Sequence, residues 1–134
     1  MTVYEDGTEV PDDGYAEAGG PAAGSLAFGW LGPGDLGPPR QCPDSLLRVL
    51  EDAARSPVGR TRGFHRCPFC PDAEFWPTHY RTTDGSELWL GSAAIEVRDM
   101  SGRTWQAPNL VLHYVTAHGY LPPAPLVETY GTVR

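Results

Sequence analysis

The sequence predicts an α+β fold, with a small antiparallel sheet and two helices. Three observations carry this prediction. An apolar stripe at helical spacing follows Pro43, four short strand-like segments lie between residues 78 and 107, and a second helical segment ends at Gly119. Because the two helices flank the run of strands in the chain, we expect them to pack on one small sheet.

The length of 134 residues fits a single domain. We expect residues 41–134 to form this domain and residues 1–40 to be a partly ordered N-terminal segment, acidic at first and then rich in glycine and proline. Its apolar island, residues 26–31, contains Phe28 and Trp30 and is expected to form a strand or to pack on the core. Residues 1–18 are poor in apolar side chains, so we expect folding not to need them.

The first helix is predicted over residues 43–55. Pro43 suits a first helical turn, and Asp44 is favourable at that end of the helix dipole. Ser56 and Pro57 end the pattern.

Strand-like segments follow the first helix. Residues 63–67 read as a strand that enters a tight turn, and further strands are expected near the residues 78–82, 87–90, 92–98 and 103–107. Pro108 is then expected to open the second helix, 108–118, which Gly119 ends as a C-cap. The tail, residues 124–134, is expected to tuck back onto the core.

Charge and cysteine content narrow the classes of function. The net charge is −7 and all ten basic residues are arginine, which disfavours general nucleic-acid binding. Apolar runs are too short for a membrane span, and the acidic N-terminus is unlike a secretory signal, so we expect a cytoplasmic location. Three cysteines, an odd number, argue against a disulfide framework.

Two pairs of residues have the spacing of metal ligands. Cys67 and Cys70 are separated by two residues, and His113 and His118 by four. A turn with this cysteine spacing can direct two thiolates at one ion, and paired histidines three to five residues apart supply the other half of a zinc site. We therefore predict one zinc ion bound by these four side chains, in a zinc-knuckle or treble-clef-like C-terminal half.

The predicted site is structural rather than catalytic. Four protein ligands leave no open position on the metal. The 42 residues between Cys70 and His113 contain the predicted sheet, so the ion would clamp elements distant in sequence. Residues five apart on a helix differ by about 140° in direction, so we expect the last helical turn to loosen for the two rings to converge.

Alternatives remain for each half of this site. Cys67 and Cys70 could be a redox pair, although a thioredoxin-like helix does not follow them. His65 shares a strand face with Cys67. It could replace His118 as a ligand, or donate a hydrogen bond to a ligand without binding the metal itself. His79 is a further candidate ligand, expected at the surface, and Cys42 is expected to be a buried free thiol.

The string from Ala107 to Tyr120, followed by Pro122 and Pro123, resembles the C-terminal signature of a family of small, uncharacterised bacterial proteins. The resemblance extends back to Arg62 and includes the middle strand, residues 91–97; it is poor over the first 40 residues. It implies the same four-ligand pattern and no particular activity.

The leading interpretation is a zinc-binding module that contacts another protein or acts in regulation. One alternative is a small zinc enzyme with three protein ligands and a base from Glu74, Glu87 or Glu96. Another is a nucleic-acid-associated regulator that uses the patch of Arg55, Arg60, Arg62 and Arg66. Aromatic residues around the site, if several are exposed, would suit a protein groove; they are Phe69, Phe75, Trp76, Tyr80, Trp89 and Trp105.

Overall fold

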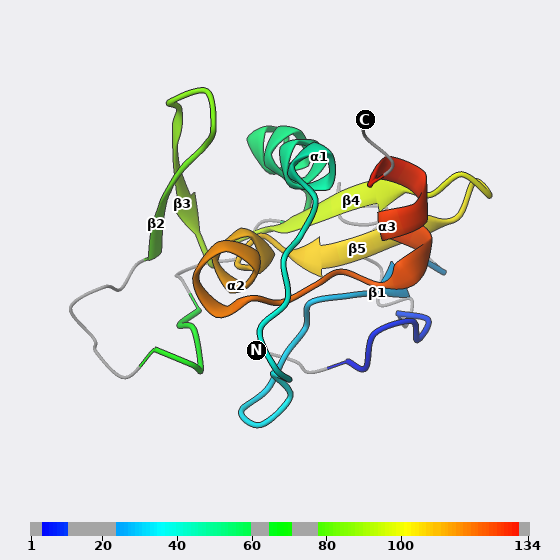
Figure 1. Ribbon diagram of the computed structural model, residues 1–134, viewed down its shortest axis with the longest axis horizontal. Coiled ribbons are helices and arrows are strands. Elements are labelled where there is room, and N and C mark those ends of the chain that lie inside the picture. The colour runs from blue at the N-terminus through cyan, green and yellow to red at the C-terminus, as the bar shows by residue number, and fades with distance from the viewer. Residues whose placement is uncertain (1–3, 11–23, 60–64, 71–77, 132–134) are drawn as a thin grey trace.

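The computed structural model describes residues 4–10, 24–59, 65–70 and 78–131. Its elements, in chain order, are β1 (Leu26–Ala27), α1 (Asp44–Arg55), β2 (Thr78–Arg81), β3 (Glu87–Leu90), β4 (Ala94–Arg98), β5 (Thr104–Pro108), α2 (Val111–His118) and α3 (Ala124–Tyr130) (Figure 1). The α+β class is confirmed. Within the described ranges the structure adds a third helix, α3, where we expected only a tail that tucks back.

The main sheet has the strand order β1-β5-β4. β4 and β5 form an antiparallel hairpin with Val97 opposite Trp105, and β1 pairs with β5 in parallel, Leu26 opposite Trp105. This sheet is therefore mixed rather than purely antiparallel. The parallel strand comes from the apolar island 26–31, whose Phe28 is fully buried and packs edge-to-face on Trp105 at 6.3 Å.

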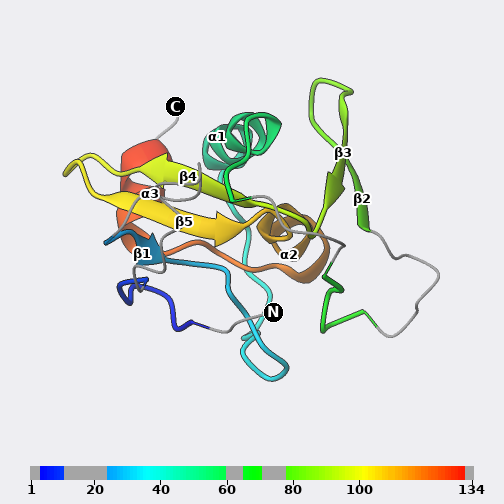
Figure 2. The same cartoon turned by 180° about the vertical axis from the view of Figure 1, so that it is seen from behind.

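The strands β2 and β3 form a second, antiparallel sheet that projects beside α1 (Figures 1 and 2). The carboxylate of Glu51, on α1, holds this hairpin. It accepts a hydrogen bond of 2.5 Å from the Tyr80 hydroxyl and one of 2.8 Å from the Thr83 hydroxyl. Glu51 is only 2% exposed, and these bonds compensate for the burial of its carboxylate.

The N-terminal residues 4–10 lie along β1. The Gly7 N–H donates to the Ala27 carbonyl at 2.8 Å, and the Val10 N–H donates to the Ser25 carbonyl at 2.7 Å. The Asp6 carboxylate also accepts bonds from the Gly29 N–H and the Tyr120 hydroxyl. The expectation that folding does not need this end of the chain is therefore not supported for residues 4–10, while residues 11–18 lie outside the described ranges.

The second helix begins later than predicted. Pro108 is the last residue of β5, where it pairs with Ala94, and α2 starts at Val111. Between them the Asn109 side chain accepts a bond of 2.7 Å from the Gly91 N–H. The predicted end is confirmed, because Gly119 adopts a left-handed conformation with φ 72°.

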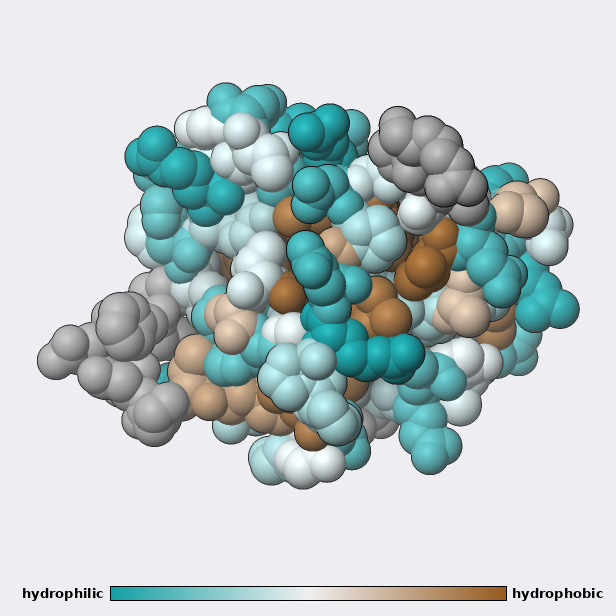
Figure 3. Space-filling model, in the orientation of Figure 1, coloured by the Kyte–Doolittle hydropathy of each residue, from teal (hydrophilic) through white to brown (hydrophobic). Residues whose placement is uncertain are grey.

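The described helices include none that is long and apolar enough to cross a membrane. Hydrophilic residues cover much of the face in Figure 3, and apolar residues show between them near its centre. Only Trp89 and Met100 are exposed large hydrophobic residues in the part of the chain that the structure describes.

Candidate metal centre

A tight turn presents the two cysteines. The Cys70 N–H donates to the Cys67 carbonyl at 3.4 Å, and the Phe69 N–H donates to the Cys67 Sγ at 3.4 Å. An N–H directed at the sulfur favours its thiolate form, which is the form that binds metal. Cys67 is buried, 7% exposed, and Cys70 is half-buried.

Close backbone contacts fix the turn to the body of the protein. The His65 N–H donates to the Gly91 carbonyl at 2.8 Å. A Cβ atom on Gly91 would lie 2.6 Å from the His65 carbonyl oxygen, and the φ of Gly91 is +107°. Position 91 therefore needs glycine, and Asn109, between β5 and α2, anchors the same residue by accepting its N–H.

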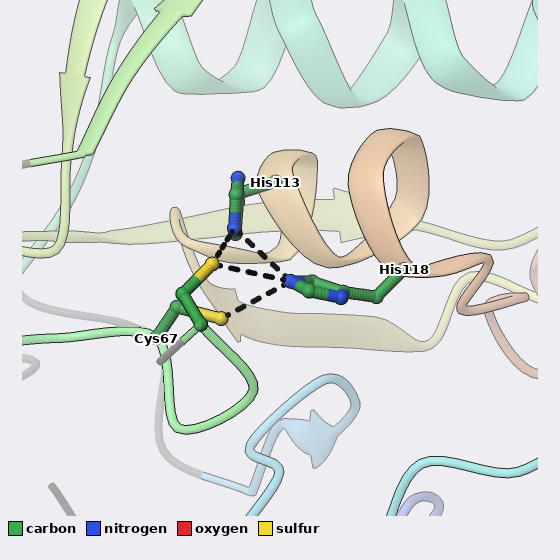
Figure 4. A group of neighbouring side chains, drawn as sticks. Cys67, His113 and His118 are labelled. Carbon is green, nitrogen blue, oxygen red and sulfur yellow. Dashed lines mark hydrogen bonds between the residues drawn. The ribbon is translucent and has the colours of Figure 1, made fainter. Parts of the chain in front are cut away.

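The two histidines come from the two ends of α2. His113 lies in its first turn and His118 is its last residue, yet their Nε2 atoms are 3.2 Å apart. Figure 4 shows both rings directed at the cysteine sulfurs. The helix extends through His118, and its end is widened as expected: the N–H groups of Gly119 and Tyr120 both donate to the Tyr114 carbonyl, and Gly119 is left-handed.

Phe69, between the cysteines, packs on α2. Its ring centroid lies 5.5 Å from that of Tyr114 and 5.5 Å from that of His118. These contacts hold the turn against the helix and orient the His118 ring. Phe69 is one of the aromatic residues expected around the site, but residue spacing gives no signal for this contact.

The four donor atoms converge on one point. The Cys70 Sγ lies 3.2 Å from the His113 Nε2 and 3.5 Å from the His118 Nε2, and the Cys67 Sγ lies 3.4 Å from the His118 Nε2. Bonds of about 2.3 Å to sulfur and about 2.0 Å to nitrogen give a tetrahedral zinc edges of about 3.3 Å between nitrogens and about 3.5 Å between nitrogen and sulfur. The four residues therefore fit a tetrahedral metal ion.

These residues form the one group with metal-site geometry in the described ranges, with all donor atoms within 4.8 Å of one another. Burial raises the pKa of the Cys67 thiol to about 11. Burial, and then the neighbouring His118, lower the pKa of His113, and burial lowers that of His118. A lowered pKa favours the neutral imidazole that binds metal, while the raised pKa of Cys67 means that a nearby cation would help its thiol to ionise.

The rival ligands lie elsewhere. His65 is partly buried beside the turn but is not a member of the group. His79 lies on the exposed face of the β2–β3 hairpin, where its Nε2 pairs with Glu87 at 2.7 Å and its ring contacts that of Trp89. Cys42 is a buried free thiol, as expected, and burial, followed by the nearby Asp44 charge, raises its pKa to about 11.

The structure describes two members of the predicted arginine patch, Arg55 and Arg66, and Arg55 is paired with acidic residues. Arg55 pairs with Asp52 at 2.5 Å and with Asp84 at 2.8 Å. Arg66 also has an interaction partner. Arg60 and Arg62 lie outside the described residues.

The aromatic residues around the site belong mostly to the core. Trp105 is 3% exposed and Tyr80 is 9% exposed, whereas Trp89 is 58% exposed. Phe75 and Trp76 are outside the described ranges. Trp89 is thus the one member of this set that the structure shows at the surface.

A family described as "Domain of unknown function (DUF7919)" matches residues 2–131. The chain belongs to this family. The match includes the first 40 residues, over which the resemblance seen in the sequence was poor, so the DUF7919 domain takes in the N-terminal segment as well as the metal centre. No curated protein and no solved structure matches the chain.

Proposed function

We propose that this chain binds one zinc ion through Cys67, Cys70, His113 and His118, and that the ion stabilises the fold rather than catalysing a reaction. The observation that carries the proposal is the convergence of two sulfur and two nitrogen donors at tetrahedral spacing. Two thiolates with two imidazoles are a typical zinc ligand set, and four protein ligands complete the coordination.

The ion would act as a clamp across the chain. Cys70 and His113 are separated by 42 residues, which include both β-hairpins. Metal binding closes this long segment into a loop, which reduces the conformational entropy of the unfolded chain. Structural zinc can contribute on the order of 10 kcal/mol to the stability of small domains. We expect the cysteine turn and α2 to dock stably only when metal is bound.

We further propose that the folded domain is a cytoplasmic protein-interaction or regulatory module. The exposed indole of Trp89, next to His79, supports a protein partner, because exposed aromatic side chains are enriched at protein interfaces. A nucleic acid is disfavoured as the partner, because the net charge of −7 repels its phosphate backbone and Arg55 is already paired with acidic residues.

The enzyme alternative has less support. It needs a metal position open to water and a base beside it. Glu87, one of the suggested bases, pairs with His79 on the β2–β3 hairpin, and Glu96 lies on β4 opposite Gln106. Glu74 lies outside the described residues.

Metal analysis combined with X-ray absorption spectroscopy tests the proposal. We expect one zinc per chain with two sulfur and two nitrogen ligands. The matched control is His79→Ala, which removes a histidine outside the group and should keep the metal. A folded protein that takes up no zinc would refute the proposal, and three protein ligands with a bound water would favour the enzyme.

A further inference from the structure

We infer that the zinc centre is redox-regulated: peroxide oxidises Cys67 and Cys70 to an intramolecular disulfide, and the ion is released. This inference rests on the proposed zinc site. Its first observation is the uneven burial of the ligands. Cys70, His113 and His118 are only partly buried, while Cys67 is covered. One ligand sulfur is therefore within reach of a small oxidant, and the other lies behind it.

The two sulfurs are placed for bond formation with each other. Only two residues separate the cysteines, and both Sγ atoms lie against the same His118 Nε2, at 3.4 and 3.5 Å. The turn between them is held by the Cys70 N–H to Cys67 carbonyl bond. A disulfide requires the sulfurs to approach to about 2.05 Å, which a shift of side chains within one short turn can supply.

The oxidation proceeds in two steps. The Cys70 thiolate attacks one oxygen of hydrogen peroxide, the O–O bond breaks, and hydroxide leaves, so that Cys70 becomes a sulfenic acid. The Cys67 thiolate then attacks the Cys70 sulfur, the S–S bond forms, and the S–O bond breaks to release a second hydroxide. Both hydroxides take up protons to give water. The two sulfurs lose two electrons in total, and peroxide accepts them.

The disulfide removes half of the ligand set. His113 and His118 would remain, and two imidazoles hold zinc far more weakly than the complete site. Without the ion, the described contacts between the cysteine turn and α2 include the ring contacts of Phe69 with Tyr114 and His118, which are weaker than metal ligation. A thiol reductant together with zinc would restore the clamp, so the folded module would be maintained under reducing conditions.

The third cysteine serves as an internal control. Cys42 is 8% exposed and is not part of the metal-binding group. Its thiol lies next to the Pro43 carbonyl, at 3.5 Å. Cys42→Ala should therefore leave both zinc binding and peroxide-driven release unchanged.

Peroxide titration of the reduced, zinc-loaded full chain tests the inference. Released zinc is measured with a metallochromic indicator, and disulfides are mapped by mass spectrometry of a non-reducing digest. We expect one zinc released for each Cys67–Cys70 disulfide, the same result for Cys42→Ala, and recovery with reductant and zinc. Oxidation of Met100, which is 69% exposed, gauges the oxidant dose.

Two results would overturn the redox inference while leaving the zinc site intact. One is zinc retained at doses that convert Met100 to its sulfoxide. The other is zinc lost while Cys67 and Cys70 carry sulfinic acids or pair with other cysteines. A reduced, folded chain that never binds zinc would instead refute the proposed function, and the redox inference would fall with it.

Discussion

Gly119 and Pro39 are in direct contact: a Cβ atom on Gly119 would lie 2.7 Å from both the Cα and the Cβ of Pro39. The next residue, Arg40, donates its N–H to the Gly119 carbonyl at 2.8 Å. Gly119 follows His118 directly, so the segment before α1 contacts the end of the helix that carries both histidines of the candidate metal centre. Pro39 and Gly119 are 80 positions apart in the sequence.

Gly119→Ala should destabilise the protein and weaken metal binding. Alanine at φ +72° costs about 1–2 kcal/mol, and the contact with Pro39 adds to that. We expect a lower Tm and a weaker zinc affinity, measured by thermal melts and competition with a chelator. Gly34→Ala is the matched control, since Gly34 also has positive φ, +93°, but has nothing within 4 Å of the added Cβ. Equal effects of the two variants would contradict the role of the Pro39 contact.

Loss of a metal ligand should destabilise the fold as a whole. Cys70→Ser and His118→Ala each remove one donor from the group. Because structural zinc can contribute on the order of 10 kcal/mol, comparable to the whole stability of a domain, we expect these variants to lose cooperative unfolding or to aggregate. Thermal melts with and without chelator provide the measurement, with His79→Ala as the control. A Tm shift below about 2 °C in both ligand variants would argue for a dispensable metal.

The N-terminal segment should stabilise the fold through Asp6. Its carboxylate accepts bonds from the Tyr120 hydroxyl at 2.7 Å and from the Gly29 N–H at 3.0 Å. Asp6→Ala leaves both donors without this acceptor and should cost about 1–3 kcal/mol in the free energy of unfolding. Chemical denaturation measures the loss, and Glu5→Ala, at an exposed neighbour, should change little. A double-mutant cycle of Asp6→Ala with Tyr120→Phe isolates the side-chain pair, and full additivity would show that the pair does not interact.

Acid sensitivity should depend on Asp99, in the turn between β4 and β5. The Trp105 indole N–H donates to its carboxylate at 2.9 Å, and this bond lowers the pKa of Asp99 below its usual 3.8. A folded-state pKa below the unfolded one means that the ionised carboxylate stabilises the fold. That contribution is complete above the unfolded pKa and is lost as the pH falls through the folded one.

Asp99→Asn should therefore flatten the dependence of stability on pH below about pH 4. Asparagine keeps an oxygen acceptor for Trp105 but has no charge to titrate. Urea denaturation of both proteins across the acid range is the measurement. Asp52→Asn is the control at an exposed helix position whose side chain is 73% exposed. An unchanged pH profile in Asp99→Asn would show that the buried hydrogen bond does not set the acid response.

Local patterns in the sequence determined most elements. The 43–55 helix was predicted within one residue, because its apolar stripe and its flanking prolines act locally. The strands β2 to β5 lie where alternating or short apolar segments indicated them. The four residues of the metal group were also predicted, since ligand spacing follows from the geometry of one turn and one helix.

The tertiary structure decided what depends on contacts between distant residues. The parallel pairing of β1 with β5, the separation of β2 and β3 into a second sheet, and the end of β5 at Pro108 depend on which strands pair in the folded chain, and that choice involves residues far apart in the sequence. From the sequence, His65 was an alternative to His118 as a ligand. In the structure the His65 backbone is hydrogen-bonded to Gly91, and its side chain is not part of the group of four. Spacing shows which side chains can reach one ion, whereas packing of the turn against α2 brings the four donor atoms to one point.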